Sequence, residues 1–123
     1  MNAGQTVIWS PDGNSIPHLY IALNNSADCG GKVVMVNVTG AQGGMHAFPI
    51  VRGQHRFIRK PSEINFGDGV LAEASEVQNS INFGFATPHD DMDIVLVEKI
   101  ARAAMIHPAC SKEIQRTLKA VWK

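Results

Sequence analysis

Two apolar, β-prone segments close together in the chain constrain the fold more than any other feature. Residues 19–23 (LYIAL) and residues 32–39 (KVVMVNVT) are short, apolar and rich in aromatic or β-branched side chains. Such runs are typical of buried strands. The segment between them ends in Gly30 and Gly31, and glycine tolerates the positive φ angles of a tight turn. The sequence therefore predicts two strands joined by a turn.

Other short segments have a similar but weaker pattern. Residues 6–9 are β-prone and precede a turn signal, SPDGN, while residues 40–44 (GAQGG) predict a flexible loop. Further strand candidates are residues 45–51, 62–66 and 81–85, and residues 70–74 fit either a strand or a helical turn.

The C-terminal part has helical rather than strand periodicity. Apolar residues between 94 and 105 fall on one helical face, and the acids at 90–93 are favourable at a helix N-terminus. A strand at 93–97 is the alternative, because IVLV is β-branched, but we favour the helix. Ser111 is a suitable N-cap for a final amphipathic helix that extends to residue 121. Short strands followed by helices predict a mainly β (α+β) fold, a small barrel or sandwich with one or two C-terminal helices.

Length and composition are those of one globular domain. The chain has 123 residues, of which 45% are hydrophobic and 18% charged, so we expect a single domain over 1–123. It contains no long apolar run and no leader-like N-terminus, so we expect a cytoplasmic protein. Cys29 and Cys110 are the only cysteines. We interpret them as unpaired thiols, although a bridge between them is an alternative.

The charges are unevenly distributed, although the net charge is zero. Arg52, Arg56, Arg59 and Lys60 lie close together with no acid among them, whereas residues 61–98 contain eight acids and no lysine or arginine. A local positive field of this kind suits a phosphate-bearing partner. The alternative is that the basic and acidic segments face each other and cancel.

The two apolar strands also carry a family resemblance. Residues 18–23 and 32–39 resemble the paired strands of the PemK/MazF toxin superfamily, and residues 53–66 (GQHRFIRKPSEINF) are similar to the stretch before a later family strand. The helix expected at 111–121 would match the closing helix of the family. The resemblance implies an SH3-like barrel that forms a homodimer. It also implies a metal-independent endoribonuclease that cuts RNA and is neutralised by an antitoxin-like protein.

Two positions depart from the family pattern. The family's catalytic arginine precedes a proline, whereas this chain reads Ile16-Pro17-His18. The hydroxyl pair that ends a family strand is reduced to Thr39-Gly40, which keeps only the threonine. A non-catalytic barrel that binds nucleic acid or a protein partner is therefore an alternative, and an unrelated small β domain is a third.

Metal-free RNA cleavage needs a base, an acid and donors for the phosphate. Histidine suits proton transfer near neutral pH, and arginine offers a planar donor face. We therefore name His18, Thr39, His55 and Arg56 as catalytic candidates. Arg52, Arg59 and Lys60 are candidates for nucleic-acid binding. Each also has a structural reading, as a strand residue or part of a solvated hairpin tip.

Metal and cofactor sites are not predicted. Residues 89–93 (HDDMD) contain metal-binding side chains, but their spacing matches no defined metal loop. An acid-rich helix start is the simpler interpretation. The glycines at 40–44 have no lysine beside them, so they do not form a phosphate-binding motif.

Overall fold

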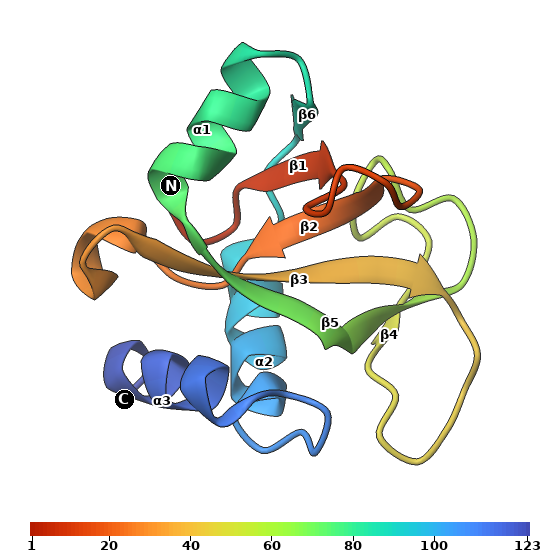
Figure 1. Cartoon of the computed structure of the whole chain (residues 1–123). Coiled ribbons are helices and arrows are strands. Elements are labelled where there is room, and N and C mark those ends of the chain that lie inside the picture. The colour runs from red at the N-terminus through yellow and green to blue at the C-terminus, as the bar shows by residue number, and fades with distance from the viewer.

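A computed structural model describes residues 1–123 as a six-stranded antiparallel sheet with three α-helices (Figure 1). The strands are β1 (Thr6–Trp9), β2 (His18–Ala22), β3 (Lys32–Gly40), β4 (Pro49–Ile50), β5 (Ser62–Glu73) and β6 (Ala86–His89). The helices are α1 (Ala74–Asn82), α2 (Ile94–Ala104) and α3 (Lys112–Val121), with a short 3-10 helix η1 (Ser26–Cys29). The predicted mainly β, α+β architecture is confirmed.

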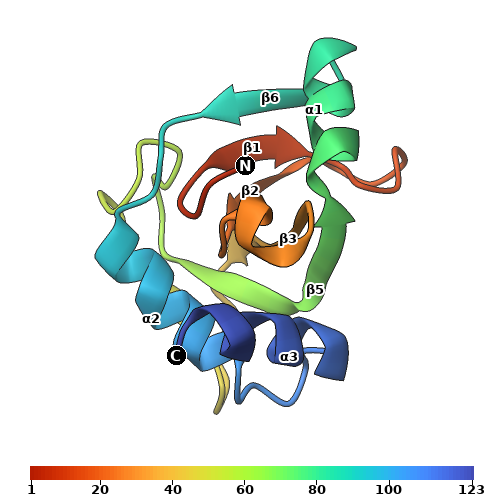
Figure 2. The same cartoon turned by 90° about the vertical axis from the view of Figure 1, so that its left-hand side faces the viewer.

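The sheet is curled into a half-barrel, with the strand order β4-β5-β3-β2-β1-β6. Figure 2 shows α2 and α3 together on one side of the sheet, whereas α1 lies at the opposite end near β6. The short strands β4 and β6 are the two edges. β6 contains Pro88, which an edge strand accepts because one row of its backbone groups has no strand partner.

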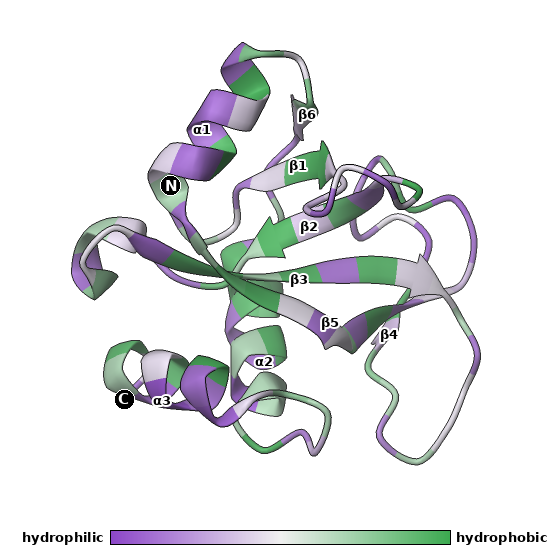
Figure 3. Ribbon diagram, in the orientation of Figure 1, coloured by the Kyte–Doolittle hydropathy of each residue, from purple (hydrophilic) through white to green (hydrophobic).

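The central strands are buried on both faces, which explains their continuous apolar sequences. On β3, Val34, Val36 and Val38 join the main core under α2 and α3. Val33 and Met35 point the other way, into a smaller core closed by Val77 of α1. In Figure 3 the hydrophobic colour accordingly follows the central strands and α2, while α1 carries more hydrophilic positions.

Both C-terminal helices begin at a side-chain cap: α2 at Asp93, within the acidic segment expected at its start, and α3 at Ser111, the predicted cap. The Asp93 carboxylate accepts a hydrogen bond from the backbone N–H of Leu96 at 3.1 Å. The Ser111 hydroxyl accepts one from the N–H of Ile114 at 3.2 Å. Residues 94–104 are therefore helical, and the strand alternative is wrong. None of the helices has the length and apolar character needed to cross a membrane.

The predictions for residues 70–85 need correction. β5 continues to Glu73, so residues 70–73 are strand, and the predicted strand at 81–85 is wrong. Ile81 lies in α1, and residues 83–85 form the turn before β6, with Gly84 at a φ of 80°. α1 gave no clear signal because only one of its residues is fully buried and no side chain caps its start. The predicted strand at 45–51 is likewise reduced to Pro49–Ile50.

β5 is irregular in its middle, opposite Val36. The pairing with β3 shifts between Met35 and Asn37, so that four residues of β5, Phe66 to Gly69, face this one residue. Gly69 lies close to its neighbours: a Cβ there would be 3.1 Å from the carbonyl oxygen of Phe66 and 3.4 Å from Ile114. This bulge opens the sheet beside β3 and contributes to a cavity described below.

The two cysteines lie apart and both are free thiols. Cys110 packs in the main core, where burial raises the pKa of its thiol. Cys29 is half-buried at the end of η1.

Candidate nucleic-acid interface

The segment 51–61, called the basic loop below, is held to the body of the protein by two buried side chains. Ile58 packs in the main core, and its N–H donates to the carbonyl oxygen of His55 at 2.9 Å. The His55 side chain is only 5% exposed. Its Nδ1 accepts from the N–H of Phe57 at 3.0 Å, and its Nε2 donates to the carbonyl oxygen of Asp90. The loop is therefore anchored while its remaining side chains face solvent.

These contacts bear on the prediction that His55 is catalytic. Both ring nitrogens are bonded to the backbone, so neither is free to exchange a proton with a substrate. The ring also lies against His89, with centroids 5.0 Å apart. This geometry favours a structural role for His55, as the anchor between the basic loop and the segment that follows β6.

A cavity of about 390 Å³ lies between the basic loop and the ends of β2 and β3. We call it the basic groove. Its lining residues are Pro17, His18, Val38, Thr39, Gly40, Phe57, Ile58, Arg59, Lys60 and Ser62. No acidic side chain is among them. The groove thus joins residues from three separate segments of the chain, 17–18, 38–40 and 57–62.

Four of the seven predicted site residues meet in this groove. His18 is placed by β2, and its Nδ1 donates to the carbonyl oxygen of Ile16 at 2.8 Å, while its Nε2 has no hydrogen-bond partner. Thr39 is half-buried near the end of β3. Arg59 and Lys60 come from the basic loop, and the ammonium of Lys60 lies 3.9 Å from where a Cβ on Gly40 would be.

Arg52 and Arg56 lie outside the groove. The side chain of Arg56 is 81% exposed and forms an ion pair with Asp90, with Nη1 3.2 Å from Oδ2. It lines a neighbouring hollow with Phe57, Arg59 and His89, so the positive surface continues beyond the groove. Arg52 is exposed on the loop. Arg56 is the only loop cation in an ion pair, so the acidic segment does not cancel the basic one pair by pair.

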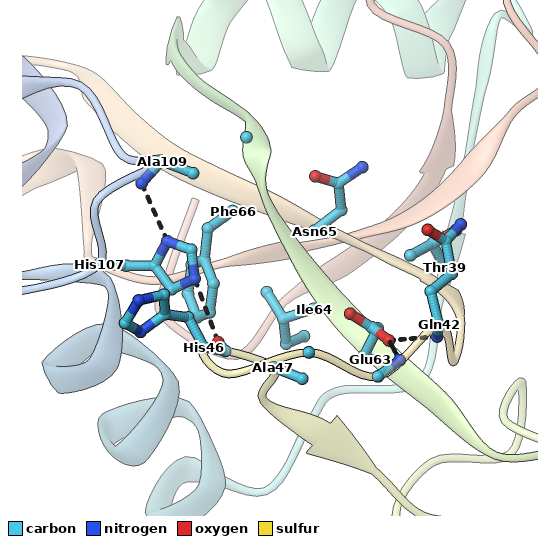
Figure 4. Close-up of a pocket in the computed structure, with 13 residues that line it drawn as sticks. Thr39, Gln42, His46, Ala47, Glu63, Ile64, Asn65, Phe66, His107 and Ala109 are labelled. Carbon is cyan, nitrogen blue, oxygen red and sulfur yellow. Dashed lines mark hydrogen bonds between the residues drawn. The ribbon is translucent and has the colours of Figure 1, made fainter.

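Thr39 also borders a second cavity, of about 310 Å³, which Figure 4 shows. Here Glu63 accepts hydrogen bonds from the N–H groups of Gln42 and Gly43, the latter at 3.0 Å. On the far side the ring of His107 bonds through both nitrogens, to the carbonyl oxygen of His46 and the N–H of Ala109. These bonds hold the 41–48 loop in place. Two groups that line this cavity have no hydrogen-bond partner, the ring nitrogens of His46 and Oε2 of Glu63.

A third cavity contains a buried polar residue that sequence reasoning missed. Asn37 is 2% exposed, and its Nδ2 donates to the Tyr20 hydroxyl at 3.3 Å. Its Oδ1 is the one buried side-chain nitrogen or oxygen in the chain without a hydrogen-bond partner. An unmade bond of this kind costs about 1–3 kcal/mol. The available signal was a single asparagine within an otherwise apolar strand, KVVMVNVT.

Comparisons with known proteins add no family. Protein-family models give no match to this chain, and neither the curated proteins nor the solved structures give a significant one.

Proposed function

We propose that this protein binds single-stranded RNA along the basic groove. The observation that carries the proposal is the convergence of Arg59 and Lys60 with the exposed ring of Phe57 in a cavity without acids. Proteins that bind single strands combine a positive groove for the backbone with aromatic rings on which bases stack. Thr39 and His18 add further polar groups to the same wall.

The charge arrangement supports binding of the phosphate backbone. Arg59 and Lys60 form no ion pair within the protein, so their charges remain available to a ligand. Phosphate contacts position a strand without reading its bases. Phe57 is 41% exposed and is the aromatic side chain of the groove available for stacking. A single strand exposes its bases to such a ring, whereas a duplex keeps them stacked.

The first test is the affinity for a labelled heptauridylate, measured by fluorescence anisotropy. The double variant Arg59→Ala/Lys60→Ala is expected to bind about tenfold more weakly, equivalent to about 1.4 kcal/mol. The matched control is Arg116→Ala/Lys119→Ala, which removes two exposed cations from α3. Equal losses in both variants would show unspecific attraction to positive charge and contradict the proposal.

Phe57 distinguishes RNA from a simple anion. Phe57→Ala should weaken heptauridylate binding at least about fivefold, because stacking of one base is worth about 1–3 kcal/mol. It should leave the weaker binding of inorganic pyrophosphate unchanged. Phe83→Ala, which removes a ring that is 75% exposed outside the groove, is the control. Unchanged RNA affinity in Phe57→Ala would remove stacking from the account.

RNA cleavage is a second candidate function, favoured by one observation. His18, whose Nε2 has no hydrogen-bond partner, lines the same groove as Thr39 and Arg59, so an imidazole, a hydroxyl and a cation suited to phosphate share one cavity. With His55 bonded to the backbone, the groove contains only one histidine. Binding is therefore the better supported function, and cleavage would need another proton donor.

Cleavage is tested by incubating the protein with a long single-stranded RNA in EDTA. Product that forms in EDTA and disappears in His18→Ala would establish metal-independent cleavage at this groove. Product that persists in His18→Ala would assign the activity elsewhere. His46→Ala, which removes an exposed histidine outside the groove, is the control.

The PemK/MazF-like resemblance belongs to the same proposal. The resemblance would imply an SH3-like barrel, a homodimer, a cytoplasmic location and an antitoxin-like partner. Light scattering of the purified protein tests the homodimer: twice the 13.3 kDa chain mass is the expected result, and the chain mass itself would contradict it. Inhibition of RNA binding by a co-expressed antitoxin-like protein would test the partner.

A further inference from the structure

The third cavity, about 370 Å³ in volume, shares His18 with the basic groove. Among its lining residues are Trp9, His18, Tyr20, Asn37, Asp68 and Gly69, and we call it the acceptor pocket. Its position follows from the sheet register, which pairs Trp9 with His18 and Tyr20 with Asn37. Binding pockets for small organic groups commonly fall near this size, about 300–1,000 Å³.

Asn37 supplies the first specific feature of the acceptor pocket. It is buried and paired on one side only: its Nδ2 donates to Tyr20, and its Oδ1 has no partner. Buried polar atoms are nearly always bonded, and Asn37 is among the residues that line the pocket, so its unpaired oxygen is an acceptor for which the protein itself supplies no donor.

The acidic side chains of the pocket also favour a ligand that brings hydrogen-bond donors. Apart from His18, no basic side chain lines it, whereas Asp12 and Asp68 do. Asp12 is occupied: its carboxylate accepts from Ser10, Asn14 and Ser15, and these bonds hold its pKa well below the usual range. Asp68 is bonded only through Oδ2, to Asn65, and therefore retains a free oxygen.

Tyr20 adds a donor to these two acceptors. Its hydroxyl oxygen accepts from Asn37, which leaves its own proton for another group. Burial raises the pKa of Tyr20, and the nearby carboxylates of Asp68 and Asp12 raise it further, while the bond from Asn37 lowers it. The hydroxyl therefore keeps its proton at neutral pH. Trp9 packs edge-on against the Tyr20 ring, with centroids 5.4 Å apart, and gives the pocket an aromatic wall.

The pocket thus offers two acceptors, one donor and an aromatic wall, next to a groove suited to phosphates. The Watson–Crick edge of guanine is the complement: two N–H donor groups, at N1 and N2, beside the O6 acceptor. Uracil presents one donor between two acceptors, and adenine and cytosine present one amino group each. We propose that the acceptor pocket takes a guanine base of the RNA strand bound in the basic groove. This inference rests on the proposed function.

The test compares the heptanucleotides UUUUUUU, UUUAUUU and UUUGUUU, with a single guanine to avoid guanine self-association. The wild-type protein is expected to bind UUUGUUU at least about tenfold more tightly than the other two. Asn37→Leu, which removes the unpaired acceptor at similar volume, should reduce this preference to less than about twofold and leave UUUUUUU affinity unchanged. Asp68→Asn, at an exposed position, should also reduce the preference, and Asp28→Asn is its control.

The outcomes separate the two proposals. Binding of all three heptanucleotides with equal affinity overturns the guanine pocket and leaves the groove standing. Weaker binding of every heptanucleotide in Asp68→Asn, with the preference unchanged, also overturns it. No binding of any heptanucleotide by the wild-type protein overturns both proposals. Thermal unfolding of each variant verifies that it is folded. If Asn37→Leu does not fold, Asp68→Asn still decides the test.

Discussion

Single residues in this protein divide into those that hold the site and those that face a ligand. His55 and Ile58 are buried and anchor the basic loop, whereas Arg59 and Lys60 of the same loop remain exposed. The sequence identified the basic cluster but could not separate these roles. A histidine among arginines gives the same local sequence pattern whether its side chain is buried or exposed. Burial of His55 depends on Asp90, 35 positions away, whose carbonyl oxygen receives the Nε2 hydrogen bond.

His55→Ala is expected to destabilise the protein. The substitution leaves the N–H of Phe57 without its partner and the carbonyl oxygen of Asp90 with only the Thr6 hydroxyl, at a cost of about 1–3 kcal/mol in the free energy of unfolding. Urea denaturation measures the change. His46→Ala, which removes an exposed ring, should stay within about 0.5 kcal/mol. Unchanged stability of His55→Ala together with lost RNA cleavage would restore the catalytic interpretation.

The elements that carry strong local signals were predictable from sequence, and those stabilised by tertiary contacts were not. β3 is rich in β-branched residues, and α2 and α3 begin at side-chain caps. α1 has neither property: its stability comes from packing of Val77 against strands distant in sequence. The C-terminal half of β5 was ambiguous because the bulge at 66–69 interrupts its periodicity.

The start of α2 can be tested at its cap. Asp93→Ala removes the acceptor for the N–H of Leu96, and the free energy of unfolding should fall by about 1 kcal/mol. Asp91→Ala removes an exposed acid of the same segment that caps nothing and should change stability by less than about 0.5 kcal/mol. Equal effects of the two substitutions in urea denaturation would contradict the assigned cap.

The bulge in β5 gives a second prediction at this scale. Gly69→Ala places a Cβ 3.1 Å from the carbonyl oxygen of Phe66 and 3.4 Å from Ile114, so crowding should destabilise the fold by about 1–3 kcal/mol. At Gly67 the nearest atom would be 3.4 Å away, at the end of the Asn65 side chain. Gly67→Ala should therefore be milder in a thermal unfolding comparison. The reverse order would contradict the geometry of the bulge.

At the scale of the whole molecule, a neutral chain displays a local positive surface. The topology brings the loop after β4 beside the ends of β2 and β3, so that residues far apart in sequence share one groove. The sequence supplied the residue types that made His18, Thr39 and Arg59 candidates. It could not supply their proximity to one another, nor the unpaired oxygen of Asn37, because both depend on the strand pairing.

This arrangement predicts a salt dependence for RNA binding. Each phosphate neutralised on a single strand contributes a slope of about −0.7 to the dependence of log K on log salt concentration. If Arg59 and Lys60 each contact one phosphate, the double alanine variant should reduce the magnitude of the slope by about 1.4. Anisotropy titrations at several salt concentrations measure it. A slope equal to that of the wild-type protein would exclude both residues from phosphate contact.

The most direct test of the RNA-binding claim is a backbone amide NMR titration of the ¹⁵N-labelled protein with heptauridylate. We predict that chemical-shift changes concentrate in residues 57–60 and at the groove ends of β2 and β3, around His18 and Thr39. The amide signals of α3, which carries basic residues outside the groove, should keep their chemical shifts. Shifts centred on α3, or none at a heptauridylate concentration of 1 mM (about −4 kcal/mol of binding free energy), would contradict the account.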